Sequence, residues 1–470
     1  MKNQLDWSAG ANTTMIELTQ VKKNKITLTD YNYRRDIENR LLLASFNTSE
    51  VAVLEEILYS PIKVLIRKIA KNIDKTEEEI LPTLEKLAQT GLLTIEGDSI
   101  TVDKETRKYF ETEIEKFEPD FCPGMEFLQN TLKKVPIHVL PIWYAIPRTS
   151  NNIFESLVEK YLLTPQIFQR YLLELTFGDP ALSAIAQDVL RSPDLTLTAS
   201  DVMKKYGLSR EKFEENMLIL ELHFVCCLTL QQSGDSWEEK VTPFHEWRQY
   251  LTFLKTTTTQ PIIDVAKIER YRSHDFAFIE DMTAILQLVK KQPTPLNPKG
   301  YADIAARLQE IPPSPQYIDQ VVTKLQLLKL AEVVEGKLHA AQPASEWLEM
   351  RVENRALYLY RDPLNKLQSY SEKVMRDAEK AVLRILHTGW VFYDEFDKGV
   401  IVPFGDHPAA TLKKCGKGWK YALPEYTPDE RAFIHAIVFE WLFEAGITAI
   451  GTYQGRQCFA VTPFGQSLFG

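Results

Sequence analysis

The fold is decided by the stretch from Pro61 to Val102, which reads PIKVLIRKIAKNIDKTEEEILPTLEKLAQTGLLTIEGDSITV. Its first part predicts one helix over Pro61–Ile73, because apolar side chains recur there at helical spacing. These side chains are Ile62, Leu65, Ile66, Ile69 and Ile73. A second helix is expected over Thr76–Thr90, and Gly91 is placed to end it.

The last part of this stretch predicts a β-hairpin. Two short runs rich in β-branched residues flank Glu96-Gly97-Asp98, which is a typical turn signal. Helices followed by a hairpin are the order of a winged helix, and this order recurs along the chain. Three further copies are expected, over residues 180–247, 276–347 and 428–468.

The residues that leave each predicted hairpin support the repetition. Val241–Phe244 and Val461–Phe464 both read VTPF, and Ala341–Trp347 (AQPASEW) is close to Val241–Trp247 (VTPFHEW). We expect the Thr to cap the next helix and the Pro to take its first position. Trp247 and Trp347 are expected to fill equivalent cores. The alternative is an irregular helical protein, in which a strand–Thr–Pro–helix junction is common.

The end of the chain resembles a known kind of domain. Residues 441–450 read WLFEAGITAI, and residues 458–470 read CFAVTPFGQSLFG. This segment is similar to the closing part of helicase-associated winged-helix domains, found next to XPB-type helicases and in stand-alone bacterial proteins. Such domains typically end in a strand, Thr-Pro-Leu-Gly and a short apolar helix, and Phe464 replaces the Leu here. The resemblance implies a tandem winged-helix scaffold near nucleic acid and carries over no catalytic residue.

The predicted fold class is α+β, mainly helical with short β-hairpins, as tandem winged helices joined by helical connectors. The connectors are expected to include helices within Phe127–Leu175 and an amphipathic helix over Asn365–His387. The predicted divisions are an N-terminal arm (1–32), winged helix 1 (33–120), a connector (121–178), winged helix 2 (179–255), winged helix 3 (256–350), a connector (351–385) and a C-terminal winged-helix-like domain (386–470).

Charge and composition exclude several classes of protein. The chain has 470 residues, with 55 Lys and Arg against 64 Asp and Glu, so its net charge is -9. An acidic chain repels phosphate on average, and nucleic acid would have to bind a local basic patch. No run approaches the ~20 apolar residues of a membrane span, and no signal peptide is recognisable in the first fifteen residues. We therefore expect a cytoplasmic protein that does not contact membranes.

The number and spacing of the cysteines are also those expected of a cytoplasmic protein. They number five, with no CxxC motif, and Cys226-Cys227 lies in an apolar run. We expect this pair to be buried as small apolar residues rather than to form a redox site. An odd number without framework spacing indicates a reducing environment.

Motifs of catalysis are missing from the sequence. It contains no GxGxxG, GxSxG, HExxH, paired CxxC or GxxxxGK[ST] pattern. His274-Asp275 lacks partner ligands, and the acidic run Phe392–Asp397 is expected to be a solvated loop rather than a metal site. His223 and His435 lie in apolar helices, where packing is the simpler role. We predict no enzyme, no cofactor and no metal.

Two basic segments are candidates for nucleic-acid binding. Lys63, Arg67 and Lys71 are spaced by four residues, with Lys68 beside them, which predicts a basic stripe on the first helix. The second segment is expected to be a flexible loop with one aromatic ring for stacking on a base. Its candidate residues are Lys413, Lys414, Lys417, Trp419 and Lys420. The alternative for both segments is solvated lysine without a partner.

The third helices of the first two predicted copies argue against base reading, whereas that of the third copy is slightly positive, with Lys324 and Lys329 against Asp319. In DNA-binding winged helices the third helix enters the major groove. In the first copy it carries Glu77, Glu78, Glu79 and Glu85 against Lys86, and in the second copy Glu211, Glu214, Glu215 and Glu221 against Arg210 and Lys212. Carboxylates facing phosphates would weaken binding. Winged helices also dock proteins, as in the acidic kleisin-binding subunits of bacterial condensins.

Three hypotheses about function follow. The first is a non-catalytic scaffold that binds a protein partner in a chromosome, transcription or helicase assembly. The second is direct, weakly sequence-specific binding of nucleic acid through the two basic segments, as in transcription regulation. The third is an unrecognised enzyme or effector.

Overall fold

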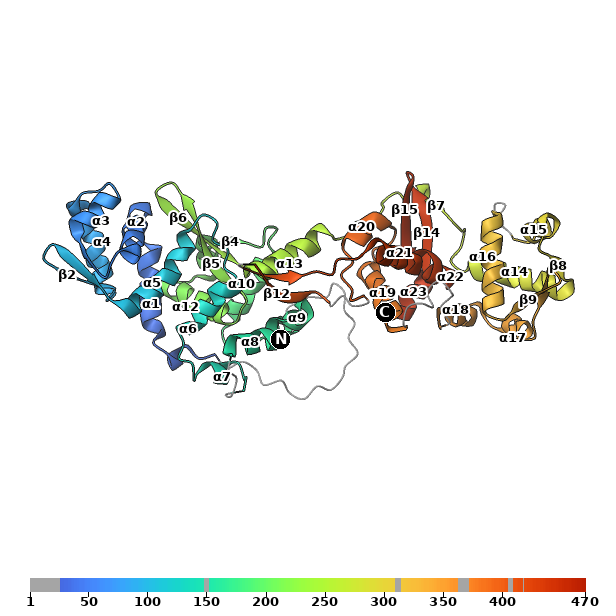
Figure 1. The fold of residues 1–470 in the computed structure, drawn as a ribbon, viewed down its shortest axis with the longest axis horizontal. Coiled ribbons are helices and arrows are strands. Elements are labelled where there is room, and N and C mark those ends of the chain that lie inside the picture. The colour runs from blue at the N-terminus through green and yellow to red at the C-terminus, as the bar shows by residue number, and fades with distance from the viewer. Residues whose placement is uncertain (1–25, 148–151, 309–313, 362–371, 405–408, 417) are drawn as a thin grey trace. The chain divides into compact units, whose positions relative to one another are not determined.

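The computed structural model describes residues 26–147, 152–308, 314–361, 372–404, 409–416 and 418–470. The described chain forms two compact units (Figure 1). Unit 1 contains residues 26–252 and 411–422, and unit 2 contains residues 253–410 and 423–470. Helices predominate, and the strands form short antiparallel sheets, which confirms the predicted α+β class.

In unit 1 the short 3₁₀ helix η1 (Leu28–Asp30) precedes α1 (Tyr33–Ala44), and six elements that form a compact group follow. A strand between its first two helices joins the hairpin, giving a three-stranded sheet of order β1-β3-β2. We call this group a helix–hairpin set. Its elements are α2 (Thr48–Tyr59), β1 (Lys63–Leu65), α3 (Ile66–Asn72), α4 (Glu77–Gln89), β2 (Leu93–Glu96) and β3 (Ser99–Val102).

The same order occurs in a second set in unit 1 and a third set in unit 2. The strand orders are β4-β6-β5 and β8-β10-β9. The second set consists of α10 (Pro180–Arg191), β4 (Leu197–Thr198), α11 (Ala199–Tyr206), α12 (Arg210–Leu222), β5 (Cys227–Ser233) and β6 (Ser236–Thr242). The third consists of α14 (Ala277–Lys291), β8 (Thr294–Pro295), α15 (Pro298–Ala305), α16 (Pro315–Leu327), β9 (Ala331–Val334) and β10 (Lys337–Ala340).

A fourth set closes unit 2. Its third helix contains a π-helical segment, η6 (Ile437–Trp441), between α21 (Pro428–Ala436) and α22 (Leu442–Glu444). Its sheet has the order β11-β15-β14-β7, in which β7 (Glu269–Arg270) is an additional edge strand. The remaining elements are η5 (Lys380–Ile385), β11 (Val391–Phe392), α20 (Tyr393–Lys398), β14 (Thr448–Tyr453), β15 (Arg456–Val461) and the closing helix α23 (Pro463–Phe469).

The prediction of one helix over Pro61–Ile73 is wrong. Val64 of β1 lies opposite Ile100 of β3, and the N–H of Val102 donates to the Ile62 carbonyl at 2.7 Å. The helix α3 begins only at Ile66. The hairpin satisfies the backbone of residues 62–65, and this distant pairing overrides their local helical spacing.

Among the hairpin exits of the described sets, the expected Thr–Pro cap occurs only at the last. Thr462 accepts a hydrogen bond from the N–H of Gly465 at 3.1 Å, and Pro463 is the first residue of α23. Thr242 instead ends β6, opposite Cys227, and α13 (His245–Thr256) begins three residues later. In the first set Asp103 caps α5 (Lys104–Ile114), and the threonine of this hairpin, Thr101, is still paired in the sheet.

The predicted helical connectors are helical where they are described. Phe127–Leu175 contains no strand in its described residues. Its helices are α6 (Met125–Lys133), α7 (Leu140–Trp143), α8 (Ile153–Leu157), the π-helix η3 (Val158–Leu162) and α9 (Pro165–Glu174). Of the predicted helix Asn365–His387, residues 365–371 lie outside the described chain, and the rest forms α19 (Glu372–Glu379) and η5.

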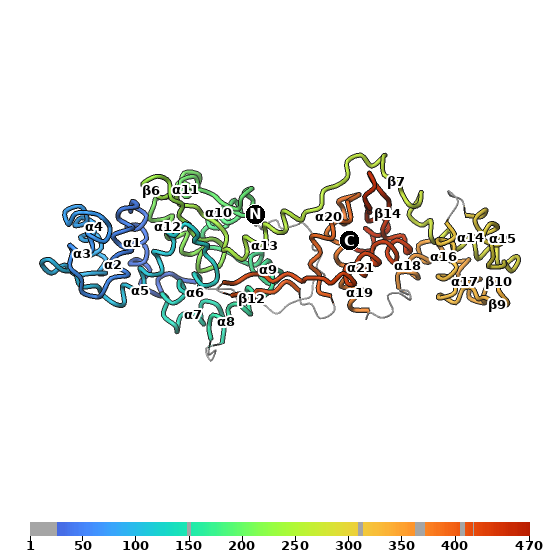
Figure 2. The backbone as a smooth tube through the Cα atoms, turned by 45° about the horizontal axis from the view of Figure 1, so that its top comes forward, coloured from blue at the N-terminus to red at the C-terminus, as the bar shows by residue number. Residues whose placement is uncertain are grey.

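A hairpin from late in the sequence completes unit 1. It consists of β12 (Thr411–Cys415) and β13 (Gly418–Ala422). The N–H of Leu412 donates to the Leu163 carbonyl at 2.8 Å, and the Tyr421 hydroxyl donates to the Leu162 carbonyl at 2.9 Å. Figures 1 and 2 show the hairpin beside α9 and α13.

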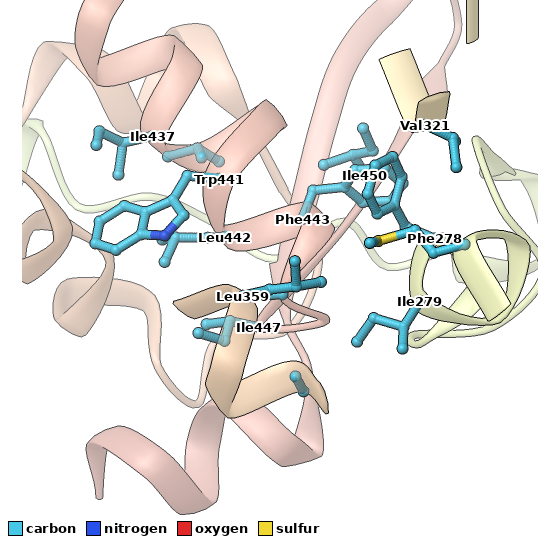
Figure 3. Packing of buried hydrophobic residues seen from close by; sticks show 14 of the residues in the cluster. Phe278, Ile279, Val321, Leu359, Ile437, Trp441, Leu442, Phe443, Ile447 and Ile450 are labelled. Atoms are coloured by element: carbon cyan, nitrogen blue, oxygen red, sulfur yellow. The ribbon is translucent and has the colours of Figure 1, made fainter. Parts of the chain in front are cut away.

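The predicted core residues are buried. Trp247 in unit 1 and Trp347 of α17 (Ala344–Glu349) in unit 2 are 4% and 1% exposed. Cys226 and Cys227 are both buried, and burial raises the pKa of each thiol, as expected for small apolar residues. In unit 2 one continuous core joins the third and fourth sets, including Phe278, Val321 and Trp441 (Figure 3).

None of the helices in the described residues combines the length and apolarity needed to cross a membrane.

Candidate nucleic-acid interface

The first basic segment is exposed, but it is not a single helical stripe. Arg67, Lys68 and Lys71 lie on α3, and all three side chains are exposed. Lys63 lies on β1, so its predicted place on the same helix is wrong. Its Nζ is 3.6 Å from a carboxylate oxygen of Glu96 on β2, which partly neutralises it. The segment therefore offers three helical cations and one strand cation to solvent.

Exposed apolar side chains lie next to these cations in the sequence, although they were not among the predicted nucleic-acid-binding residues. Tyr59 at the end of α2 is 70% exposed, and Ile62 and Leu65 are each 40% exposed. An exposed ring beside cations is the combination that stacks on bases in single-stranded nucleic acid. The signal in the sequence was the aromatic residue directly before the basic segment.

The second basic segment is a β-hairpin rather than a flexible loop. Lys413 lies opposite Lys420, and Lys414 lies opposite Trp419, in the ladder between β12 and β13. Lys417 lies outside the described residues. The ladder fixes the backbone, because each strand provides the hydrogen-bond partners of the other.

Part of this hairpin is already engaged in unit 1. The ring of Trp419 packs edge-on against Phe154 with centroids 5.9 Å apart, and Lys414 lies 3.4 Å from Glu126. Lys413 and Lys420 are exposed. Trp419 is therefore not the freely accessible stacking ring that was expected, and two of the described lysines provide most of the available charge.

The third helix of the first set, α4, presents an acidic surface. Its buried face consists of Ile80, Thr83, Leu84 and Leu87. Glu78, Leu81 and Glu85 recur on its exposed side at helical spacing. Leu81 is 39% exposed, so the surface combines negative charge with an apolar centre.

The third helix of the second set, α12, is largely covered within unit 1. Beyond its first turn nearly every side chain is buried, including Glu214, Asn216 and Glu221. Arg40 of α1 donates from Nη1 to Glu221 at 3.2 Å. A helix whose middle and end are buried cannot enter a DNA groove without disrupting unit 1.

Arg40 and Glu221 belong to a buried ionic network. Arg40 lies 3.5 Å from Asp36 and 3.9 Å from Glu214. Lys116 lies 2.8 Å from Glu113, and Lys134 contacts both Glu113 and Asp36. Burial acts to raise the pKa of Glu113, but Lys116 and Lys134 hold it below its usual range.

The network brings together five carboxylates and four cations. The carboxylates are Asp36, Glu113, Glu214, Glu221 and Glu239, and the cations are Arg40, Lys116, Lys134 and Arg210, which pairs with both Glu214 and Glu239. They lie on α1, α5, α12 and β6 and directly after α5 and α6. Pairing with opposite charges permits their burial, and the network joins the first and second sets of unit 1.

The third helices of the third and fourth sets contact each other in unit 2. Gln320 of α16 donates to Glu444 of α22 at 2.8 Å, and Lys324 of α16 forms an ion pair with the same carboxylate. Lys324 is 1% exposed and Glu444 is 5% exposed. Part of the surface of each of these helices is therefore buried by packing within unit 2.

The residues considered for chemistry have structural partners. Phe392–Asp397 is not a loop, because residues from Tyr393 form α20. Asp394 and Glu395 pair with Arg456, and Asp397 pairs with Arg431. His274 lies 3.1 Å from Glu280, and burial lowers the pKa of His223 to about 4. Within the described ranges no three His, Cys, Asp or Glu side chains are grouped to hold a metal.

Comparison of the chain with protein-family models and with curated proteins finds no match. The resemblance of residues 441–470 to helicase-associated domains therefore stays a prediction.

Proposed function

We propose that the chain is a non-catalytic scaffold of tandem winged helices that docks a protein partner in a nucleic-acid-associated assembly. Four helix–hairpin sets share one order of elements and one strand order, apart from the additional strand β7 and the insertion of β12 and β13 between the second and third helices of the fourth set. A strand after the first helix that pairs with the second strand of the hairpin is the winged-helix arrangement. This agreement supports the fold assigned in the proposal.

The main support for the proposal is that most of the third helices are not exposed for insertion into DNA. A base-reading winged helix must insert its third helix into the major groove. Here α12 is buried, and α16 and α22 contact each other. The exposed third helix, α4, carries Glu78 and Glu85, which phosphates repel. Protein docking uses such a surface better than DNA binding does.

The test is affinity capture from native lysate, with and without nuclease. Glu78→Lys combined with Glu85→Lys should remove the captured partner, because both charges flank the exposed Leu81. Glu55→Lys changes an exposed glutamate on α2 in the same set and should leave capture unchanged. Capture that depends on nucleic acid and ignores the α4 variant would contradict the proposal.

Direct nucleic-acid binding is the second candidate, and the exposed segment of Lys63, Arg67, Lys68 and Lys71 favours it. If this segment binds phosphates, replacing all four with Gln should lower the salt slope by about 0.9 per lost contact. The loss of affinity should be the same for every nucleic-acid sequence, because phosphate contacts carry no sequence information.

Under the scaffold proposal, we expect duplex binding at physiological salt to be weaker than ~10⁻⁴ M, the weak end of non-specific binding. The fourfold variant should then behave as the wild type in a fluorescence anisotropy titration. A sequence-selective dissociation constant of ~10⁻⁸ M would overturn the scaffold proposal, since true operator complexes lie in that range.

A further inference from the structure

Glu246 on α13 is a carboxylic acid buried between α13 and the start of α6. Its side chain belongs to a residue that is 3% exposed, and its Oε1 accepts a hydrogen bond from the Met125 N–H at 2.9 Å. Met125 is the first residue of α6. The other oxygen, Oε2, is buried and has no hydrogen-bond partner among the described residues. The carboxyl group therefore fastens α6 to α13 through one oxygen only.

The backbone before α6 is shaped to receive this carboxyl group. A Cβ atom at Gly124 would lie 2.6 Å from Oε1 of Glu246, closer than packed atoms approach, so only glycine leaves room for the contact. The N–H of His245, the first residue of α13, donates to the Pro123 carbonyl at 2.8 Å. Residues 123–125 are thus joined to the first turn of α13 at two points, and we call these two hydrogen bonds the α6 latch.

The titratable groups around Glu246 do not neutralise it. Glu126 on α6 is a like charge, and it is paired with Lys414 on β12 at 3.4 Å. Tyr421 on β13 and Cys227 on β5 are the other titratable groups that interact with the carboxylate. In the described part of the chain no cation acts on it. Ionisation of Glu246 therefore places an uncompensated charge inside unit 1.

This environment favours the protonated acid. Burial raises the pKa of Glu246 to about 7, although the N–H groups of Met125 and of Glu246 itself act to lower it. If the latch opens and water reaches the carboxyl group, its pKa returns to the ordinary value of 4.5. The closed latch then binds a proton more tightly than the open one. Raising the pH above 4.5 favours opening, and the effect levels off above about 7.

We propose that Glu246 is a proton-operated latch, which holds the start of α6 on α13 when it is protonated and releases it when it is ionised. The device regulates unit 1 and does not depend on the proposed docking function. Release also removes support from the β12–β13 hairpin, which lies beside α13 in Figures 1 and 2. Lys414 of this hairpin pairs with Glu126 of α6, so the hairpin should be held less firmly when α6 moves.

The test is hydrogen exchange at the Met125 amide of the full chain, corrected for the intrinsic effect of pH on exchange. We expect its protection to fall about 70-fold between pH 5 and pH 8, the ratio that linkage gives for a pKa of 4.5 in the open latch and about 7 in the closed one. Glu246→Gln cannot ionise, so its protection should change less than about twofold over this range. Other titrating groups, including His245, are present in both proteins. The same pH dependence in both proteins would overturn the proposal.

Two further variants locate the effect. Glu55→Gln changes an exposed glutamate on α2 and should keep the pH dependence of the wild type. Gly124→Ala should lower the protection of Met125 at pH 5 as well as at pH 8, because its methyl group displaces the Glu246 carboxyl group. Protection in Gly124→Ala that matches the wild type at both pH values would contradict the contact on which the latch rests.

A direct titration of the wild type needs no variant that has to fold. The Met125 amide proton lies in the hydrogen bond to Glu246, so its NMR chemical shift reports the ionisation of that carboxyl group. We expect a titration midpoint near pH 7. A midpoint close to 4.5, the ordinary value for a glutamate, would show that Glu246 is ionised at neutral pH in the closed latch and would overturn the proposal.

Discussion

Arg40→Met should lower the free energy of unfolding of unit 1 by about 3–5 kcal/mol, the cost of leaving buried charges without their partner. Arg40 is 4% exposed and forms ion pairs with Glu221, Asp36 and Glu214. Removing its charge leaves Glu221, which is fully buried, without its hydrogen-bonded cation. Lys134 still neutralises Asp36, so the loss is concentrated on α12.

Calorimetric unfolding measures this effect as a shift of the transition that belongs to unit 1. Arg40→Met combined with Glu221→Leu should recover much of the loss, because an apolar pair can replace a buried ion pair. Lys108→Met breaks the exposed pair with Glu105 and should cost less than about 1 kcal/mol. If Arg40→Met costs no more than Lys108→Met, the network does not hold α1 against α12.

Trp347→Ala should destabilise unit 2 by about 3–5 kcal/mol, because a large buried ring leaves a cavity that the core cannot fill. Trp347 is 1% exposed, and its ring packs edge-on against Tyr358 at 5.6 Å. Trp247→Ala should have the same cost in unit 1, where Trp247 packs against Phe168 at 4.8 Å. The two residues follow equivalent hairpins.

The same calorimetry separates the two substitutions. Each should shift one transition and leave the other in place, because the two side chains lie in different units. Trp390→Ala, outside these hairpin exits, is a control for the loss of a tryptophan that is not in the buried core. Unmoved transitions in both variants would show that the two tryptophans do not support equivalent cores.

The hairpins and third helices were predictable because their signals are local. Gly97 in the predicted turn has φ of +61°, and Gly336 and Gly455 occupy the matching turns of the third and fourth sets with φ of +72° and +76°. Capping boxes at Thr76 and Thr427 begin two of the third helices. These features depend on residues within a few positions of each other, which the sequence displays directly.

The short first strands were not predictable, because their hydrogen-bond partners lie far along the chain. β1, β4, β8 and β11 have two or three residues, and each exists through pairing with the second strand of a later hairpin. Lys63 was misplaced for this reason. The Arg40–Glu221 contact spans 181 residues, and no spacing rule reveals it.

The candidate site was predicted in part. The exposure of Arg67, Lys68 and Lys71 follows from their positions opposite the apolar face of α3. The packing of Trp419 and the ion pair of Lys414 depend on α8 and α6, which precede the hairpin by more than 200 residues.

The position of the β12–β13 hairpin in the sequence delays the completion of unit 1 during synthesis. Residues 26–252 leave the ribosome first, but the hairpin that completes unit 1 begins only at Thr411. At about 5–20 residues per second, the intervening segment takes roughly 8–30 s to synthesise. Throughout this interval the aromatic side chains of Trp247 and Tyr250, which later contact Tyr421, lack that cover. The nascent chain therefore presents a temporary apolar surface, on which a chaperone can act before β12 and β13 are synthesised.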